Sequence, residues 1–294
     1  MIFSKQKKLL TLVGSLLVGT MLFAGCGGAS KQEAAGSGSD KKAAVLEGKV
    51  SASGSTALLP LLKPAQESFQ SKNPKVTINL AGGGSFTGMN QAADGSVQIG
   101  NSDVDLPAEY KDKGLVDHKV VVETFVFITN KDNKVSNLTL AQVKDIMTGK
   151  ITNWKDVGGE DQAITLIHRA KSSGSRATVS DTVLKGENFT DNAIIQDSNG
   201  AVLKAISSTP GSIGYVDAPY ANDTISVLSL DGVKYTPQAV IDGKYPVYSY
   251  GHMYTKGEAT GATKAFIDYI MSDEFQNTEV EKLGFIPINK MKQK

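Results

Sequence analysis

The residues best suited to chemistry lie at 168–176, where the chain reads His-Arg-Ala-Lys-Ser-Ser-Gly-Ser-Arg. A helical pattern runs from Ser175 to Leu184, so an arginine, several hydroxyls and a glycine stand where a helix leaves its first N–H groups unpaired. Those amides and the positive end of the helix dipole point to one spot, which favours an oxyanion. Arg169 adds a guanidinium that can hold two oxygens of such an anion.

Two more turns of small residues lie upstream, Ser53-Gly-Ser-Thr56 and Gly82-Gly-Gly-Ser-Phe-Thr-Gly88. Each follows a β-rich run and precedes a helical pattern. One such turn is typical of an ordinary helix cap or a loose surface loop. Three in one chain, one of them with an arginine, indicate a site that closes around a small anion.

The first 25 residues are predicted to be a signal peptide, because three lysines precede an apolar run that is short for a membrane span. Cys26, the chain's only cysteine, follows Leu22-Phe-Ala-Gly25, which resembles the bacterial lipobox except at Phe23. We therefore expect residues 26–45 to be a lipidated cysteine and a flexible tether on the extracytoplasmic face of the membrane. The alternative is that Cys26 is a buried free thiol.

Composition narrows the class of protein that the rest of the chain can form. Roughly 250 residues follow the tether, which suffices for one large domain or two smaller ones, and without a second cysteine their stability must come from a packed core. The formal net charge is +1, and subtracting the three lysines of the signal region leaves −2. A faintly anionic protein without a basic stripe is not expected to bind nucleic acid, and local dipoles must attract any anion.

The alternation of β-rich runs and helical patterns predicts an α/β fold with parallel or mixed sheets flanked by helices. All three small-residue turns follow strands, and ligands of such folds bind beyond the carboxyl ends of strands. Extended runs near 120–129 and 245–254 bracket a middle block. We therefore expect a discontinuous lobe 1 (46–124 plus 245–294) and a lobe 2 (125–244), with the ligand between them and a hinge at the two crossings.

Seven stretches together resemble the phosphate-binding lipoproteins of bacterial phosphate ABC importers, the PstS family, across essentially all of the mature sequence. The resemblance implies two α/β lobes of the type II periplasmic-binding-protein-like fold that clamp one phosphate ion. The stretches, which occur in the family's order and spacing, are Ser53–Thr56, Gly84–Gly88, Ile99–Asp103, Gly149–Trp154, Arg169–Ser175, Gly211–Tyr215 and Leu283–Pro287.

The resemblance also implies which residues bind phosphate. The family's first turn falls on Ser55, Thr56 and the backbone N–H of Ala57, its post-glycine serine on Ser85, its aspartate on Asp103, its arginine on Arg169, and its helix-opening loop on Ser173, Gly174 and Ser175. One position departs from the pattern. Many relatives have an aspartate that pairs with the arginine where this chain has Lys171, so how Arg169 is held stays open.

Asp103 is expected to select phosphate over sulfate, because phosphate near pH 7 always carries a proton that a carboxylate can accept. The resulting prediction is a monomeric, non-catalytic receptor without metal or cofactor that delivers phosphate to an ABC permease. A receptor for sulfate or molybdate is one alternative. A secreted phosphate-ester hydrolase is another, although the chain has no Gly-x-Ser-x-Gly elbow and its histidines (His118, His168 and His252) are too scattered for a zinc site.

Overall fold

The computed structural model describes residues 45–291. The predicted signal peptide and Cys26 lie outside the described residues. No helix within the described range is long and apolar enough to cross a membrane.

The first three strands form a parallel sheet whose connections are helices. Strand β1 lies between β2 and β3 and is in parallel register with both. Helix α1 connects β1 to β2, and α2 connects β2 to β3, ending at Gly95, a left-handed glycine that terminates it. The bounds are β1 (Gly48–Gly54), α1 (Leu59–Lys72), β2 (Val76–Ala81), α2 (Ser85–Asp94) and β3 (Ile99–Ser102).

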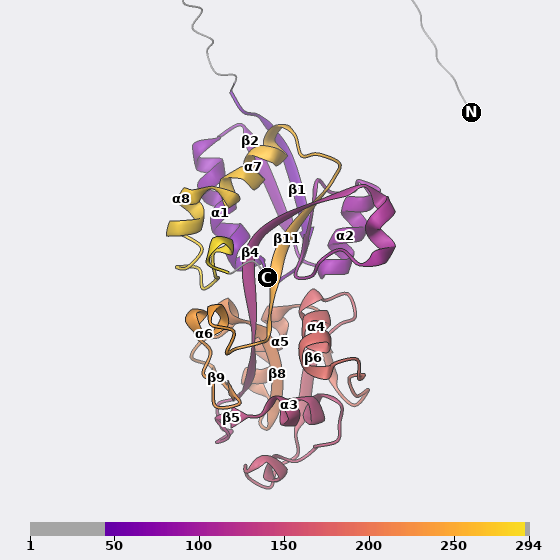
Figure 1. Ribbon diagram of the computed structural model, residues 1–294, viewed down its shortest axis with the longest axis vertical. Helices are drawn as coiled ribbons and strands as arrows, with labels where there is room; N and C mark the ends of the chain where they lie inside the picture. The colour runs from indigo at the N-terminus through magenta and orange to yellow at the C-terminus, as the bar shows by residue number, and fades with distance from the viewer. Residues whose placement is uncertain (1–44, 292–294) are drawn as a thin grey trace, which may run out of the picture. The chain divides into compact units, whose positions relative to one another are not determined.

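Two long antiparallel strands, β4 (Leu115–Asn130) and β11 (Tyr248–Lys256), run between two groups of elements (Figure 1). Strand β11 pairs with β3 on one side and with β4 on the other. The second half of β4 pairs with β8 (Ser212–Asp217) in the other group. The sheet path is therefore β2-β1-β3-β11-β4-β8-β6-β7, with β9 also pairing with β4.

The middle of the chain forms the second group. Strand β6 is parallel to β7 and to β8, and β9 is antiparallel to β4. Helix α3 begins at a capping box in which Thr139 and Gln142 each accept the other's backbone N–H. The remaining bounds are β5 (Asn137–Leu138), α3 (Leu140–Met147), β6 (Thr165–Arg169), α4 (Gly174–Val179), β7 (Ile194–Gln196), α5 (Asn199–Ser208), β9 (Ile225–Val227), β10 (Ser229–Leu230) and α6 (Pro237–Ile241).

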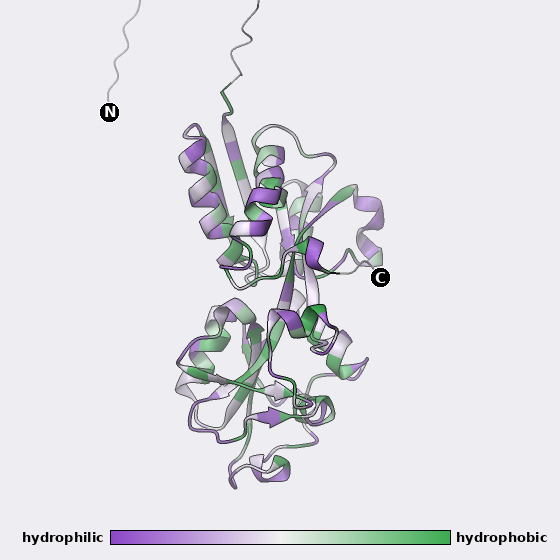
Figure 2. Ribbon diagram, turned by 60° about the vertical axis from the view of Figure 1, so that its left-hand side comes forward, coloured by the Kyte–Doolittle hydropathy of each residue, from purple (hydrophilic) through white to green (hydrophobic). Residues whose placement is uncertain are grey.

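Two short helices, α7 (Gly261–Met271) and α8 (Asp273–Thr278), return the chain to the first group. Ser272 separates them, since its backbone is extended and its hydroxyl accepts the N–H of Phe275 as the N-cap of α8. The segment from Gly261 to Thr278 therefore forms two helices and not one. Helices carry both hydrophilic and hydrophobic segments along their turns, as expected when one face covers a sheet (Figure 2).

Each group has its own apolar core. One cluster of buried side chains comes from β1, β2, α1, α7 and the first half of β4, and includes Leu61, Phe69 and Phe266. The other comes mainly from residues 122–247 and includes Phe127, Trp154 and Tyr215. The two-lobed α/β fold with helix-flanked mixed sheets that the sequence predicts is confirmed.

The structure differs from two local sequence patterns: Thr56 stands where a helix cap is expected, and Glu123-Thr124 interrupt the β-rich run 119–129. Thr56 does not cap α1, which begins at Leu59 without a side-chain cap; the hydroxyl of Ser55 accepts the N–H groups of Ala57 and Leu58 instead. Glu123 and Thr124 do not interrupt the β-rich stretch, because β4 continues through both. The two polar residues lie where β4 passes from pairing with β11 to pairing with β8, and they do not end the strand.

Candidate functional site

The residues that the sequence predicts to bind an anion lie at or just after the ends of four strands, with Ser85 in the segment after β2, and all are buried. Ser55 to Ala57 follow β1, Asp103 follows β3, and the loop containing Ser173 follows β6. The charged members, Asp103 and Arg169, are 2 % and 1 % exposed. The other buried residues of the set are Ser55, Thr56, Ala57, Ser85, Ser173, Gly174 and Ser175.

A chain of hydrogen bonds joins the two lobes at Asp103. The Ser175 hydroxyl donates to Asp103 Oδ2 over 2.8 Å, and the Asp103 N–H donates to the Ser85 hydroxyl over 3.0 Å. Asp103 Oδ1 has no hydrogen-bond partner within residues 45–291. One carboxylate oxygen is thus fixed by a serine, while the other remains available as an acceptor.

Backbone packing explains why two of the loop positions are glycines. A Cβ atom at Gly174 would lie 2.3 Å from the Ser85 hydroxyl and 2.9 Å from Asp103 Cβ. A Cβ atom at Gly84, whose φ is 93°, would lie 2.5 Å from the Ser172 carbonyl oxygen. The loops of the two lobes therefore approach each other at backbone distance, and the Phe86 N–H donates to the same Ser172 carbonyl over 3.1 Å.

Arg169 is held by the second lobe without an acidic partner at position 171. Its Nη2 donates to the Asp197 carbonyl over 3.0 Å and its Nη1 to the Ser175 hydroxyl over 3.4 Å. Lys171 is exposed. Burial lowers the pKa of Arg169 and the nearby charge of Asp103 opposes this shift, so the guanidinium stays charged. Its Nε atom has no partner among the described residues.

Arg176, which the sequence analysis did not select, supports this loop from behind. Its Nη1 donates to the Arg169 carbonyl over 3.0 Å and to His168 Nδ1 over 2.6 Å, and its guanidinium lies over the Phe189 ring at 4.2 Å. Burial first, and then the charge of Arg176, lowers the pKa of His168 to about 4. His168 is therefore a neutral acceptor near pH 7.

Thr56 connects the first lobe to α5 and to the turn after β8. Its hydroxyl accepts both the backbone N–H and the side-chain Nδ2 of Asn199, over 3.2 and 3.1 Å. The Tyr220 hydroxyl donates to the Thr56 carbonyl over 2.5 Å. Asn199 and Tyr220 were missed from sequence because they lie 143 and 164 positions away. These bonds describe a conformation in which the lobes are closed on each other.

Two further carboxyl groups, which the sequence analysis did not select, are buried near Asp103. Glu123 on β4 and Asp217 at the end of β8 are both 0 % exposed. Burial raises the pKa of both well above their ordinary values, and the charge of Asp103 raises them further. The only signal in the sequence was the acid that stands inside the apolar run of β4.

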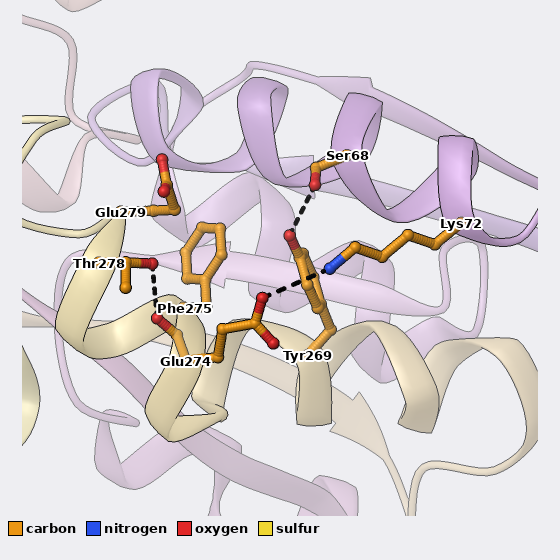
Figure 3. A pocket seen from close by; sticks show the side chains of 7 residues that line it. All are labelled: Ser68, Lys72, Tyr269, Glu274, Phe275, Thr278 and Glu279. Carbon is orange, nitrogen blue, oxygen red and sulfur yellow. Dashed lines mark hydrogen bonds and ion pairs between the residues drawn. The ribbon is translucent and has the colours of Figure 1, made fainter.

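Two other features of the described surface do not form a comparable site. A pocket between α1, α7 and α8 is lined by polar groups that already pair, such as Lys72 with Glu274 and Ser68 with Tyr269 (Figure 3). Asp105, Asp117 and His252 lie close enough together to hold a cation. The ammonium of Lys119, 3.0 Å from Asp105, already offsets one of the two carboxylate charges of that cluster.

The fold and this interlobe arrangement define the class of the protein. The PBP superfamily domain matches residues 29–274, and the chain belongs to that superfamily. Among similar proteins, the phosphate-binding protein PstS of Bacillus subtilis is 42 % identical over 98 % of this chain and 96 % of its own length. PstS of Borreliella burgdorferi is 31 % identical over 81 % of this chain and 90 % of its own length. The chain is therefore a member of the PstS family.

A solved structure agrees with this assignment. A Clostridium perfringens protein, assigned to phosphate ABC transport as a substrate-binding protein and crystallised with bound phosphate, matches with a TM-score of 0.79. It is 37 % identical, and the match covers 82 % of this chain and 100 % of that one.

Proposed function

We propose that this protein captures inorganic phosphate outside the cytoplasm and delivers it to the permease of an ABC importer. The observation that carries the proposal is a buried guanidinium and a buried carboxylate from opposite lobes that meet at one serine hydroxyl. Arg169 and Asp103 both contact the Ser175 hydroxyl, and each keeps one polar atom without a partner among residues 45–291. Family membership supports the same ligand.

The donors and the acceptor of this site match the chemistry of phosphate. Arg169, the serine hydroxyls and the free amides can bind the anionic oxygens of any tetrahedral oxyanion. Asp103 adds an acceptor, which a protonated phosphate satisfies and fully ionised sulfate does not. Sulfate carries no proton, so placing it opposite a buried carboxylate costs several kcal/mol of binding free energy, roughly a hundredfold or more in affinity. This acceptor is the reason to favour phosphate over sulfate or molybdate.

Binding without turnover is the proposed mode of action. A hydrolase needs a base beside its nucleophile, within hydrogen-bond reach. His168 is the histidine closest in sequence to Ser173 and Ser175. It receives a hydrogen bond from Arg176, and its lowered pKa makes it a weak base. The curated relatives are named as phosphate-binding proteins. We therefore assign no enzymatic role to the serines of the site.

The same proposal includes the anchor and the moving parts. Cys26 would carry the lipid that keeps the receptor at the membrane, while residues 46–124 plus 245–294 and residues 125–244 would move as two lobes of a monomer. The separate apolar clusters support such a division. Mass spectrometry of the membrane-extracted protein tests the anchor, since a lipid on Cys26 adds acyl mass to the mature N-terminal peptide.

The function is tested by titrating the purified protein with inorganic phosphate in a calorimeter. We expect one site with a dissociation constant of about 1 μM or below, which corresponds to roughly −8 kcal/mol. Sulfate should bind at least about a hundredfold more weakly. Hydrolysis of a phosphate ester should not exceed the background rate. The absence of heat from phosphate with folded protein would contradict the proposal, and so would ester turnover.

Replacing Gly174 by alanine should weaken phosphate binding by about 5- to 150-fold, the range expected for an overpacked contact. The new methyl group would meet Ser85 and Asp103 of the opposite lobe. It should leave the second lobe intact, since alanine is a better helix former than glycine. Calorimetry gives the affinity and thermal unfolding without ligand gives the stability. Gly200→Ala is the matched control, because its methyl group would have only an ordinary contact at 3.9 Å. Equal affinity in the two variants would refute the close approach.

A further inference from the structure

The most unusual group that phosphate binding does not use is the side chain of Glu123. It lies on β4 where this strand passes between the lobes, opposite Ser249 of β11. Both of its carboxyl oxygens are buried, and neither has a hydrogen-bond partner in the described part of the chain. A carboxylate in that condition would carry the full cost of a buried charge, whereas a protonated carboxyl would not.

The groups that face Glu123 come from both lobes and are mostly acidic. Asp103 follows β3, and Asp217 ends β8; the charges of both act on Glu123. The phenol of Tyr220 is also nearby, and burial raises its pKa, so it stays neutral and adds no negative charge. Burial also raises the pKa of Tyr235, whose phenol interacts with Asp217 and stays neutral. The cation Arg169 acts on Asp103. Three acids therefore share the charge of one guanidinium before an anion arrives.

Lobe closure encloses these acids without bringing them together, because Asp217 is already paired with Phe125 on the strand that carries Glu123. Asn199 holds Asp217 through its Oδ1, which accepts the Asp217 N–H over 2.9 Å. The same carboxamide donates from Nδ2 to Thr56 of the first lobe. When the Asn199–Thr56 bonds form, the lobe that carries Asp217 is joined to the loop of Thr56, and the space around Glu123, Asp217 and Asp103 is closed to water. Only one carboxyl oxygen of Asp217 has a hydrogen-bond partner. Its Oδ1 accepts the Thr124 N–H over 3.2 Å, and its Oδ2 has no partner within residues 45–291.

We propose that Glu123 holds a proton in the closed, phosphate-loaded form, and that the protein takes this proton from water as it closes on phosphate. Phosphate capture would then be coupled to proton uptake by the receptor, apart from the proton that phosphate itself carries to Asp103. Glu123 is in this view a positioning residue: it does not contact the ligand, and its neutral form permits Asp103 to be the ionised acid of the site. The inference rests on the proposed phosphate binding.

The direction of the pH effect follows from linkage. Burial, Asp103 and Asp217 raise the pKa of Glu123 in the closed form above its ordinary value of about 4.3. At a pH below this ordinary pKa, Glu123 is protonated in both the open and the closed form, so closure takes up no proton. Above it, closure takes up a proton, and this part of the affinity falls by up to about tenfold per pH unit until the raised pKa is passed. Glutamine at position 123 removes this dependence.

The test compares wild type with Glu123→Gln by phosphate calorimetry at pH 7 in buffers of different ionisation enthalpy. Phosphate's own proton changes are common to both proteins, so their difference isolates Glu123. We expect the wild type to take up about one proton more per phosphate bound than the variant. An infrared band of a protonated carboxyl group should also appear on loading the wild type and be missing in the variant. Glu258→Gln, a change at an exposed glutamate, should behave as wild type.

Three results separate the possible outcomes. Equal proton counts in wild type and Glu123→Gln would overturn the proposal. Loss of the extra proton in Asp217→Asn but not in Glu123→Gln would also overturn it, because the proton would then sit on Asp217. If the Gln variant does not fold, the proton count of Asp217→Asn still decides the case: an extra proton that persists in this variant supports Glu123, and one that is lost contradicts it. If titration of the wild-type protein with phosphate produced no heat, that result would instead contradict the proposed function.

Discussion

Replacing Arg169 with alanine is expected to reduce phosphate affinity by roughly a hundredfold to several thousandfold. The side chain is 1 % exposed, and its removal would leave the Asp103 carboxylate and the bound anion without their guanidinium partner. Breaking a buried charge pair costs about 3–5 kcal/mol, which sets this range. Titration calorimetry of the variant with inorganic phosphate measures the loss directly.

Lys171→Ala provides the matched control for this experiment. It removes a cation two positions away that is exposed to solvent. Because exposed charges are screened and contribute little, we expect a change of no more than a few fold. If Arg169→Ala and Lys171→Ala had similar small effects, Arg169 could not be the main cationic ligand. If Lys171→Ala alone were severe, the cation would have been placed on the wrong residue.

Replacing Asp103 with asparagine is expected to lower the preference for phosphate over sulfate by about a hundredfold. The carboxylate Oδ1 that could accept the phosphate proton becomes part of a neutral amide, which can donate to either anion. The several kcal/mol that a buried carboxylate imposes on sulfate therefore disappear. Competition of sulfate against labelled phosphate measures the ratio, independent of the fraction of active protein.

Asp105→Asn makes the same chemical change two residues further along, on an aspartate whose side chain is 73 % exposed. Its selectivity should equal that of the wild type. A preference for phosphate that survives Asp103→Asn undiminished would eliminate the role assigned to Asp103. Since Ser175 donates to the Asp103 carboxylate, the unfolding temperature of the ligand-free variant should be recorded as well.

Much of the fold could be predicted because its signals are local. Apolar periods and small-residue turns mark β1, β2 and β6, and the ends of these three strands carry loops of the candidate site. The two crossing runs were visible as long β-rich stretches. Arg169 was predicted from the loop in which it stands and Asp103 from the resemblance to the PstS family, and the structure brings both to one buried place. Their role in binding phosphate remains to be measured.

The remaining features depend on contacts between distant segments, which leave no local pattern. Nothing near Asn199 indicates that its carboxamide meets Thr56, and nothing near Glu123 indicates that both of its oxygens are enclosed. Arg176 looked like an ordinary residue of a helix, although it braces the Arg169 carbonyl. The break at Ser272 was hidden because apolar spacing continues on both sides of it. Burial of a polar group is a property of the folded chain and not of its sequence neighbours.

The uninterrupted course of β4 has a mechanical consequence. Its 16 residues are hydrogen-bonded to β11 in one half of the molecule and to β8 in the other, without a loop between. A continuous strand can flex and twist, but it cannot slide past its partners without breaking its ladder. We therefore expect the lobes to open by flexing and twisting β4 together with residues 245–247 at the second crossing, which would return the two halves to the same alignment after each release.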